Sequence, residues 1–124
     1  MPVRGIRGAT TVERDTREDI LAATRELLAA MVEANRIEPD DIASALFTTT
    51  PDLSGDYPAR AARELGWSAV PLLGAAEMHV PNALARCIRV LLHVNTDTHP
   101  THIKHIYLRE ARALRPDQIG RAHV

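Results

Sequence analysis

Arginines set among apolar residues are the side chains of this chain best suited to chemistry. Arg89 lies in the segment CIRVLL of residues 87–92, where every neighbour is apolar. A guanidinium group cannot lose its charge, so enclosing it favours a site that holds an anion or develops negative charge. An ordinary alternative stays open, in which this face of a strand looks to solvent and Arg89 is a surface residue.

Arg7 poses the same question near the start of the chain. Glycines lie two positions before it and one position after it, and glycine lets a ligand or another stretch of backbone approach closely. The alternative is an ordinary strand arginine beside a β-bulge. Arg63 is as readily explained by a surface ion pair. Arg115 precedes Pro116, which predicts an extended and exposed residue.

Several other reactive groups have ordinary explanations. Glu77 falls in a predicted loop, where a glutamate is usually solvated, and Tyr57 and Tyr107 are as suited to packing as to binding. Cys87 lies in apolar sequence with no neighbouring base, which predicts a buried structural cysteine rather than a nucleophile. None of these residues indicates a function by itself.

The histidines and the missing motifs limit the kinds of catalysis. His99, His102 and His105 are spaced by three residues, which suits a metal site on a helix, but the sequence around them resembles a turn. We therefore predict no metal site and interpret these histidines as incidental. The sequence contains no glycine-rich phosphate loop, no Ser/His/Asp signature and no HExxH motif. The arginines alone point to a small anionic ligand.

Length and composition exclude several classes of protein. The chain has 124 residues, with 15 basic and 16 acidic groups and a net charge of -1, and this balance argues against a nucleic-acid partner. No apolar run is long enough for a membrane span, and no signal peptide is predicted. A single cysteine excludes an internal disulfide. We expect one cytoplasmic domain over 1–124, small enough to favour a ligand cleft between subunits.

Hydrophobic periodicity predicts the elements that must position these residues. A cap at Thr16 and an apolar stripe from Ile20 to Val32 predict an amphipathic helix over 16–35, and Pro58 and Gly66 bound a short second helix over 58–65. Apolar and β-branched runs predict strands over 3–12, 42–50, 70–73, 86–94 and 105–114, with a loop over 74–83. The order β-α-β-α-β-β-β predicts an α+β fold with a mixed β-sheet.

The chain resembles one known family along almost its whole length. The matching segments are VRGIRGATTVE at 3–13, TTPDL at 49–53, PARAAREL at 58–65, VPL at 70–72, RCIRV at 86–90, NTD at 95–97, HIYL at 105–108 and LRPD at 114–117. These motifs are similar to those of the monofunctional, trimeric chorismate mutases of bacteria. Several motifs are long and free of compositional bias, so chance similarity is a poor explanation.

This resemblance implies a function and an assembly. The implied reaction is the Claisen rearrangement of chorismate to prephenate, on the route to phenylalanine and tyrosine, and it requires no cofactor. The implied assembly is a homotrimer of α+β subunits whose sheets pack into a pseudo-α/β-barrel. Its active sites lie in clefts between neighbouring subunits, and a C-terminal tail, here 118–124, is expected to close over each cleft.

The resemblance also assigns roles to individual residues. Arg7 would bind a substrate carboxylate with support from Tyr107, and Arg89 would face the ether oxygen of the breaking C–O bond. Glu77 would accept a hydrogen bond from the ring hydroxyl, and the backbone amide of Gly74 would contact the same hydroxyl. The remaining implied contacts with substrate are Tyr57, Ala59, Arg63, Leu72, Leu73, Leu114 and Arg115.

Two departures from the family and two rival functions complete the prediction. The family often has phenylalanine at the position of Tyr57 and can have cysteine at the position of Gly74. We expect the hydroxyl of Tyr57 on the cavity wall to have a small effect. Glycine at position 74 still supplies a backbone N–H, at some cost in loop entropy. One rival is a Rid-type imine deaminase, a trimer with a similar fold, whose motifs are absent here. The other is a non-catalytic trimeric binding protein for a small carboxylate metabolite, which the presence of both Arg89 and Glu77 argues against.

Overall fold

Five strands form one mixed sheet in the structure, a computed structural model that describes residues 1–115. The strands are β1 (Val3–Thr11), β2 (Ile42–Thr49), β3 (Leu72–Ala76), β4 (Cys87–Asn95) and β5 (Ile106–Tyr107), in the order β3-β2-β4-β1-β5 across the sheet. β4 is antiparallel to both β1 and β2, whereas β5 is parallel to β1 and β3 is parallel to β2. The predicted α+β class is confirmed. The predicted tail over 118–124 lies outside the described residues.

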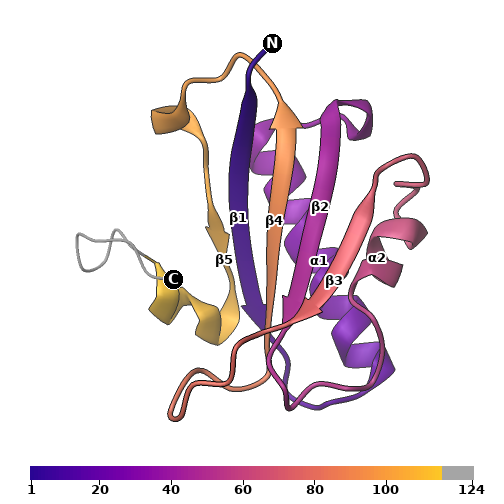
Figure 1. Ribbon diagram of the computed structural model, residues 1–124, viewed down its shortest axis with the longest axis vertical. Helices are drawn as coiled ribbons and strands as arrows, with labels where there is room; N and C mark the ends of the chain where they lie inside the picture. The colour runs from indigo at the N-terminus through magenta and orange to yellow at the C-terminus, as the bar shows by residue number, and fades with distance from the viewer. Residues whose placement is uncertain (116–124) are drawn as a thin grey trace.

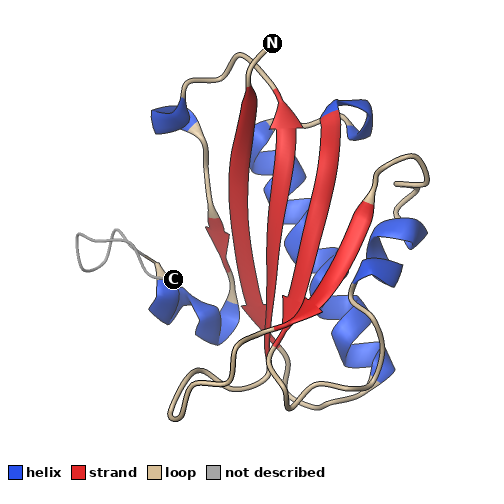
Figure 2. Cartoon of the chain, in the orientation of Figure 1, coloured by secondary structure: helices blue, strands red, loops and turns tan. Residues whose placement is uncertain are grey.

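Both α-helices cover the same face of this sheet (Figure 1). They are α1 (Arg17–Asn35) and α2 (Ala59–Glu64), and the short 3-10 helices are η1 (Pro39–Asp41), η2 (Pro100–His102) and η3 (Arg109–Leu114). Figure 2 shows the long helix α1 behind the central strands. Within residues 1–115, no helix has the length and apolar character required to cross a membrane.

The long helix α1 lies where the sequence predicts it. Thr16 is the N-cap, and its hydroxyl accepts a hydrogen bond from the backbone N–H of Asp19 at 3.1 Å. Arg36 follows the helix in the left-handed conformation, with φ of 53°, and ends it. The apolar stripe is fully buried at Ile20, Leu27, Leu28 and Met31. This stripe supplies the layer on which the sheet packs.

Strand alternation divides the side chains of β4 between two faces, as side chains of a strand point alternately to either side. Arg89 and Leu91 are half-buried on the face that neither α-helix covers, and Arg7 of β1 lies directly opposite Leu91. The other face carries the side chains that share core clusters with α1, namely Ile88, Val90, Leu92 and Val94. The face opposite the α-helices therefore holds both arginines singled out in the sequence.

Gly8 lies on the helix-covered face of β1, where its lack of a side chain serves packing. A Cβ atom at Gly8 would overlap Sδ of Met31 and lie 3.2 Å from Cδ1 of Leu27, and both residues belong to α1. The close approach suggested by the glycine next to Arg7 does exist. However, the approaching element is a helix rather than a ligand.

β3 differs from the predicted strand because backbone pairing extends it past the apolar run. The sequence predicts a strand over 70–73 and a loop from residue 74, but β3 starts at Leu72 and continues to Ala76, paired with β2. The backbone N–H of Glu77 then donates to the carbonyl of Thr49 at 2.8 Å. The predicted loop therefore starts too early, since pairing with β2 outweighs the low strand propensity of Gly74 and the alanines after it.

The strand predicted over 105–114 is wrong over most of its length. β5 has only two residues, and η3 follows it. Arg109 ends the extended conformation with a left-handed φ of 53°. Leu108, Ala111 and Leu114 recur at every third position, which is the period of a 3-10 helix, and Ala111 is completely buried. From Arg109 onward this segment is therefore a 3-10 helix rather than a strand.

Gly55 holds the loop between β2 and α2 against the start of α1. The carboxylate of Asp15 accepts hydrogen bonds from the backbone N–H groups of Ser54 and Gly55, each at 2.8 Å. The backbone bond from Ser54, with help from that of Gly55, lowers the pKa of Asp15. A Cβ atom at Gly55 would lie 2.9 Å from the backbone N of Arg17 and 2.9 Å from the backbone C of Thr16. This loop leads to Tyr57, so its anchoring bears on a predicted site residue.

Gly55→Ala is expected to lower the free energy of unfolding by about 1–3 kcal/mol, the usual cost of overpacking. The loss arises because backbone atoms, rather than a flexible side chain, must move to admit the new methyl group. The midpoint of urea denaturation at fixed protein concentration measures it. Gly5→Ala is the control, because a Cβ there lies 3.6 Å from Leu91, an ordinary contact. Equal midpoints for the two variants would contradict this account of Gly55.

Candidate active site

Cross-strand pairing gathers chemical side chains into two neighbouring rows on the face opposite the α-helices. Residues directly opposite one another in a sheet project to the same side, with Cβ atoms about 4.5–5.5 Å apart. Read from β1 through β4 to β2, the rows are Arg7, Leu91 and Leu46, and then Ala9, Arg89 and Thr48. The register therefore brings the two arginines close together although they lie far apart in sequence.

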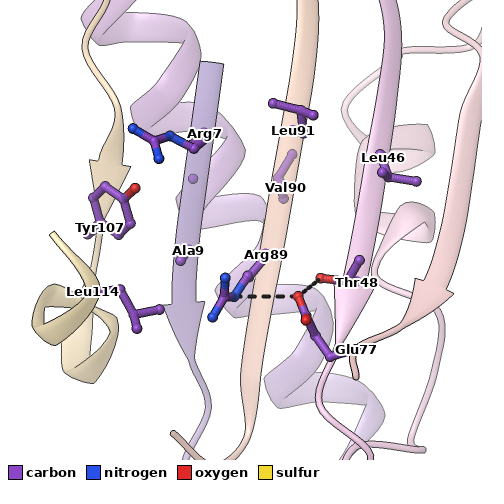
Figure 3. A pocket seen from close by; sticks show the side chains of 11 residues that line it. Arg7, Ala9, Leu46, Thr48, Glu77, Arg89, Val90, Leu91, Tyr107 and Leu114 are labelled. Atoms are coloured by element: carbon purple, nitrogen blue, oxygen red, sulfur yellow. Dashed lines mark hydrogen bonds and ion pairs between the residues drawn. The ribbon is translucent and has the colours of Figure 1, made fainter. Parts of the chain in front are cut away.

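A cavity of about 320 Å³ lies over these rows (Figure 3). Glu77 borders it after the end of β3, Tyr107 borders it from β5, and Leu114 borders it from η3. In Figure 3, the side chain of Arg89 points toward Glu77. Five of the predicted site residues meet in this one cavity, namely Arg7, Glu77, Arg89, Tyr107 and Leu114.

Arg89 presents a charged N–H group that has no hydrogen-bond partner in the described chain. Its Nε atom is buried, and Oε1 of Glu77 lies 3.5 Å from it, outside the range of about 2.7–3.2 Å for an N–H···O bond. The Arg89 side chain is 34% exposed. A buried donor without an acceptor is unfavourable, so this N–H suits an acceptor atom on a bound molecule.

Glu77 is held by β2 through both its backbone and its side chain. The hydroxyl of Thr48 donates to Oε1 of Glu77 at 2.7 Å, and the carbonyl of Thr49 accepts the Glu77 N–H. Within residues 1–115, no hydrogen bond engages the other carboxylate oxygen, Oε2. That oxygen can accept a hydrogen bond from a ligand hydroxyl.

His105 supports Arg7 through the backbone of β1. The Nδ1 atom of His105 accepts a hydrogen bond from the Arg7 backbone N–H at 3.0 Å, so this atom carries no proton. Burial, together with the charge of Arg7, lowers the pKa of His105 and favours the neutral ring that this bond requires. The interpretation of His105 as incidental was therefore wrong, because its ring takes part in the support of a candidate site residue.

The remaining candidate reactive groups named from the sequence are His99, His102 and Cys87. Within the described residues, no three His, Cys, Asp or Glu side chains gather where they could hold a metal ion. The rings of His99 and His102 meet edge to face, with centroids 6.2 Å apart. Cys87 is buried, as predicted, and burial raises the pKa of its thiol.

A second group of predicted site residues lies apart from the cavity in a single chain. Tyr57 is 71% exposed and Leu73 is 65% exposed. Tyr57 and Gly74 line a separate concavity of about 500 Å³. Ala59 at the start of α2 and Leu72 at the start of β3 are half-buried and pack against the main core. One chain therefore holds the predicted site residues in separate concavities.

The two remaining predicted arginines also lie outside the cavity. The Nη1 atom of Arg63 donates to the carbonyls of Trp67 and Ser68, at 3.0 Å each, which closes the end of α2. The surface ion pair considered for Arg63 is replaced by these backbone contacts. Arg115 is half-buried and lines a third concavity together with Arg7.

Sequence reasoning missed Thr48 and Leu46, both of which line the cavity. One signal was available, because alternation in the predicted strand over 42–50 places these two residues on one face. Their position opposite Arg89 and Leu91 depends on the pairing of β2 with β4, which no local pattern specifies.

The cavity combines two fixed cations, one anchored carboxylate and apolar walls. Such a site can bind a small dianion through Arg7 and stabilise negative charge that develops near Arg89. The carboxylate of Glu77 can accept a hydrogen bond from a hydroxyl group of the ligand. No Ser, Cys or His in the cavity stands ready as a nucleophile or general base within the described lining. The two cations suit a reaction that needs positioning and charge stabilisation.

Comparison with known proteins agrees with this chemistry. The sequence model of the chorismate mutase type I family matches residues 3–118. The chain is 56% identical over 116 residues to Chorismate mutase AroH of Thermus thermophilus, covering 93% of this chain and 95% of the relative. It is 49% identical over 118 residues to Chorismate mutase AroH of Bacillus subtilis (strain 168), covering 94% and 93%.

A solved structure gives the same result for the fold. The chorismate mutase from Clostridium thermocellum superimposes with a TM-score of 0.89 at 49% sequence identity, covering 90% of this chain and 99% of that one. The sequence match and the structural match both extend over nearly the whole chain. This chain therefore belongs to the chorismate mutase type I family.

Proposed function

We propose that the cavity of Arg7, Glu77 and Arg89 is where this enzyme rearranges chorismate to prephenate. The observation that carries the proposal is the buried Arg89 Nε, which has no hydrogen-bond partner in the described chain and borders a cavity also lined by Arg7. The near full-length similarity to chorismate mutases supports the reaction.

The chemistry of the substrate explains why these residue types suffice. Chorismate is a dianion, and its rearrangement is one pericyclic step in which a C–O bond breaks as a C–C bond forms. No proton moves and no nucleophile attacks, so neither a catalytic triad nor a metal is needed. The protein can hold the compact conformer in reacting geometry and stabilise the charge that builds on the ether oxygen.

Each residue of the cavity then has one role. Arg7, whose backbone is held by His105, binds a substrate carboxylate with support from Tyr107. Arg89 directs its unused Nε–H toward the ether oxygen. Oε2 of Glu77 accepts a hydrogen bond from the ring hydroxyl, because Oε1 already accepts one from Thr48. Leu114 closes one wall.

The exposed residues around Tyr57 support the proposal of a homotrimer with shared active sites. Tyr57, Leu73 and Gly74 are exposed on one chain, and large exposed apolar side chains commonly mark an interface. β3 is also an edge strand with its outer backbone groups open to pairing. We propose that the concavity beside Tyr57 of one subunit completes the Arg89 cavity of its neighbour. The cytoplasmic location stays a prediction.

A direct assay tests the reaction, and sizing tests the assembly. Purified protein mixed with chorismate is expected to remove the ultraviolet absorbance of the substrate far faster than the uncatalysed reaction. A folded protein that binds chorismate without consuming it would overturn the activity and favour a binding function. Light scattering is expected to give three times the subunit mass. A stable, fully active monomer would overturn the shared site.

A further inference from the structure

We infer that Thr48 is a positioning residue that holds Glu77 away from Arg89. The hydroxyl of Thr48 donates to Oε1 of Glu77 at 2.7 Å, while Nε of Arg89 lies 3.5 Å from the same oxygen. This inference rests on the proposed function, because it concerns how the free enzyme leaves the Nε–H of Arg89 unbonded before substrate binds.

The distance between Glu77 and Arg89 requires an explanation. A carboxylate and a guanidinium that meet in a partly enclosed site form short hydrogen bonds, typically about 2.7–2.9 Å from N to O. Here the Arg89 Nε is buried and unbonded although a carboxylate oxygen is within 3.5 Å of it. Some other contact must oppose the final approach of Glu77.

Thr48 is placed to supply that contact. It stands on β2, opposite Arg89 of β4 on one side and Ala75 of β3 on the other, and the Glu77 carboxylate lies between the side chains of Thr48 and Arg89 in Figure 3. Glu77 follows β3 closely and is tied to β2 by its backbone N–H. The hydroxyl bond therefore restrains Oε1 on the β2 side of the cavity, and Figure 3 shows this bond beside the longer contact to Arg89.

Two consequences for the reaction follow from this restraint. Arg89 keeps its Nε–H free for the ether oxygen, where negative charge develops. Glu77 keeps Oε2 free for the ring hydroxyl, because Oε1 is the oxygen that Thr48 engages. Without the hydroxyl, Glu77 would move onto Arg89, and the pair would satisfy each other instead of the substrate.

The test compares Thr48→Val, which removes the hydroxyl at nearly constant volume, with Thr48→Ser, which keeps it. We expect Thr48→Val to lower kcat about tenfold, the effect of losing one hydrogen bond, with a smaller change in KM. Thr48→Ser should retain most of the wild-type kcat. Ser44→Ala is the matched control, because it removes a hydroxyl from the same face of β2. The Ser44 hydroxyl is hydrogen-bonded to Nδ1 of His93 at 2.8 Å and does not line the cavity. Wild-type kcat in Thr48→Val, or an equal loss in Thr48→Ser, would overturn the inference.

Two further measurements separate this inference from its alternatives. In a Glu77→Ala background, Thr48→Val should have no further effect on kcat, whereas an undiminished tenfold loss would show that Thr48 acts without Glu77. A crystal structure of Thr48→Val should show Glu77 Oε1 within hydrogen-bond distance of Arg89 Nε, and an unchanged separation of 3.5 Å would contradict the restraint. The structural result does not depend on turnover, so it stands apart from a failure of the proposed function itself.

Discussion

Arg89→Gln is expected to lower kcat for the rearrangement of chorismate by about 10²-fold or more, the scale seen when a donor to a developing oxyanion is lost. Glutamine retains a polar side chain but cannot supply a permanent positive charge. The contact with the ether oxygen strengthens as the C–O bond lengthens, so kcat should fall much more than KM rises. Steady-state kinetics over a range of chorismate concentrations separates the two constants.

The control for Arg89 is another arginine that carries the same charge away from the cavity. Arg25 pairs with Glu64 at 2.7 Å on the surface of α1, so Arg25→Gln changes the net charge equally without touching the site. We expect wild-type kinetics for Arg25→Gln. An Arg89→Gln enzyme with normal kcat and raised KM would mean that Arg89 binds the ground state and the transition state equally.

Arg7→Gln is expected to raise KM for chorismate by roughly 10- to 100-fold, since hydrogen bonds to charged groups contribute about 1.5–3 kcal/mol. Arg7 would hold a carboxylate whose charge changes little during the reaction, so kcat should change less than KM. The same kinetic measurement tests both statements. Arg4→Gln is a suitable control on the same strand, because Arg4 donates to the carbonyl of Thr98 and does not line the cavity.

The opposite kinetic pattern would be informative for Arg7. A large fall in kcat with unchanged KM would place Arg7 at the developing charge rather than at a carboxylate. The position of Arg7 in the row next to that of Arg89 makes this a real alternative that the measurement decides. Together, the two arginine variants assign binding and charge stabilisation to separate residues.

The elements with strong local signals could be predicted from the sequence. α1 has a cap at Thr16 and a continuous apolar stripe, and both are visible without knowing the rest of the fold. β4 could be recognised from its apolar run. β3 could not be bounded, because its last residues are glycine and alanine, which join the sheet only through pairing with β2. The predicted strand over 105–114 misses η3, because Leu108, Ala111 and Leu114 do not by themselves distinguish a short 3-10 helix from the end of a strand.

The candidate site was predictable mainly through family resemblance. Arg89 is conspicuous among apolar neighbours, but an arginine at this position is equally compatible with a solvent-exposed strand face. The pairing of the strands decides the matter, because it places Ala9 and Thr48 on either side of Arg89. Tyr57 and Gly74 carry no local sign of a site, and in a single chain they lie in a separate concavity. Thr48 was overlooked because its partner, Glu77, lies beyond the next strand.

The alternation along β4 separates the tasks of folding and catalysis at the level of single residues. Its even-numbered side chains from Ile88 to Val94 lie in the core, whereas Arg89 and Leu91 face the cavity. Between Ile88 and Val94, a substitution at one parity need not disturb packing at the other, so stability and activity can vary almost independently over this part of the strand. This offers a route for tuning substrate preference in the laboratory, or over evolutionary time, by exchanging residues of one parity on a scaffold that the other parity keeps intact.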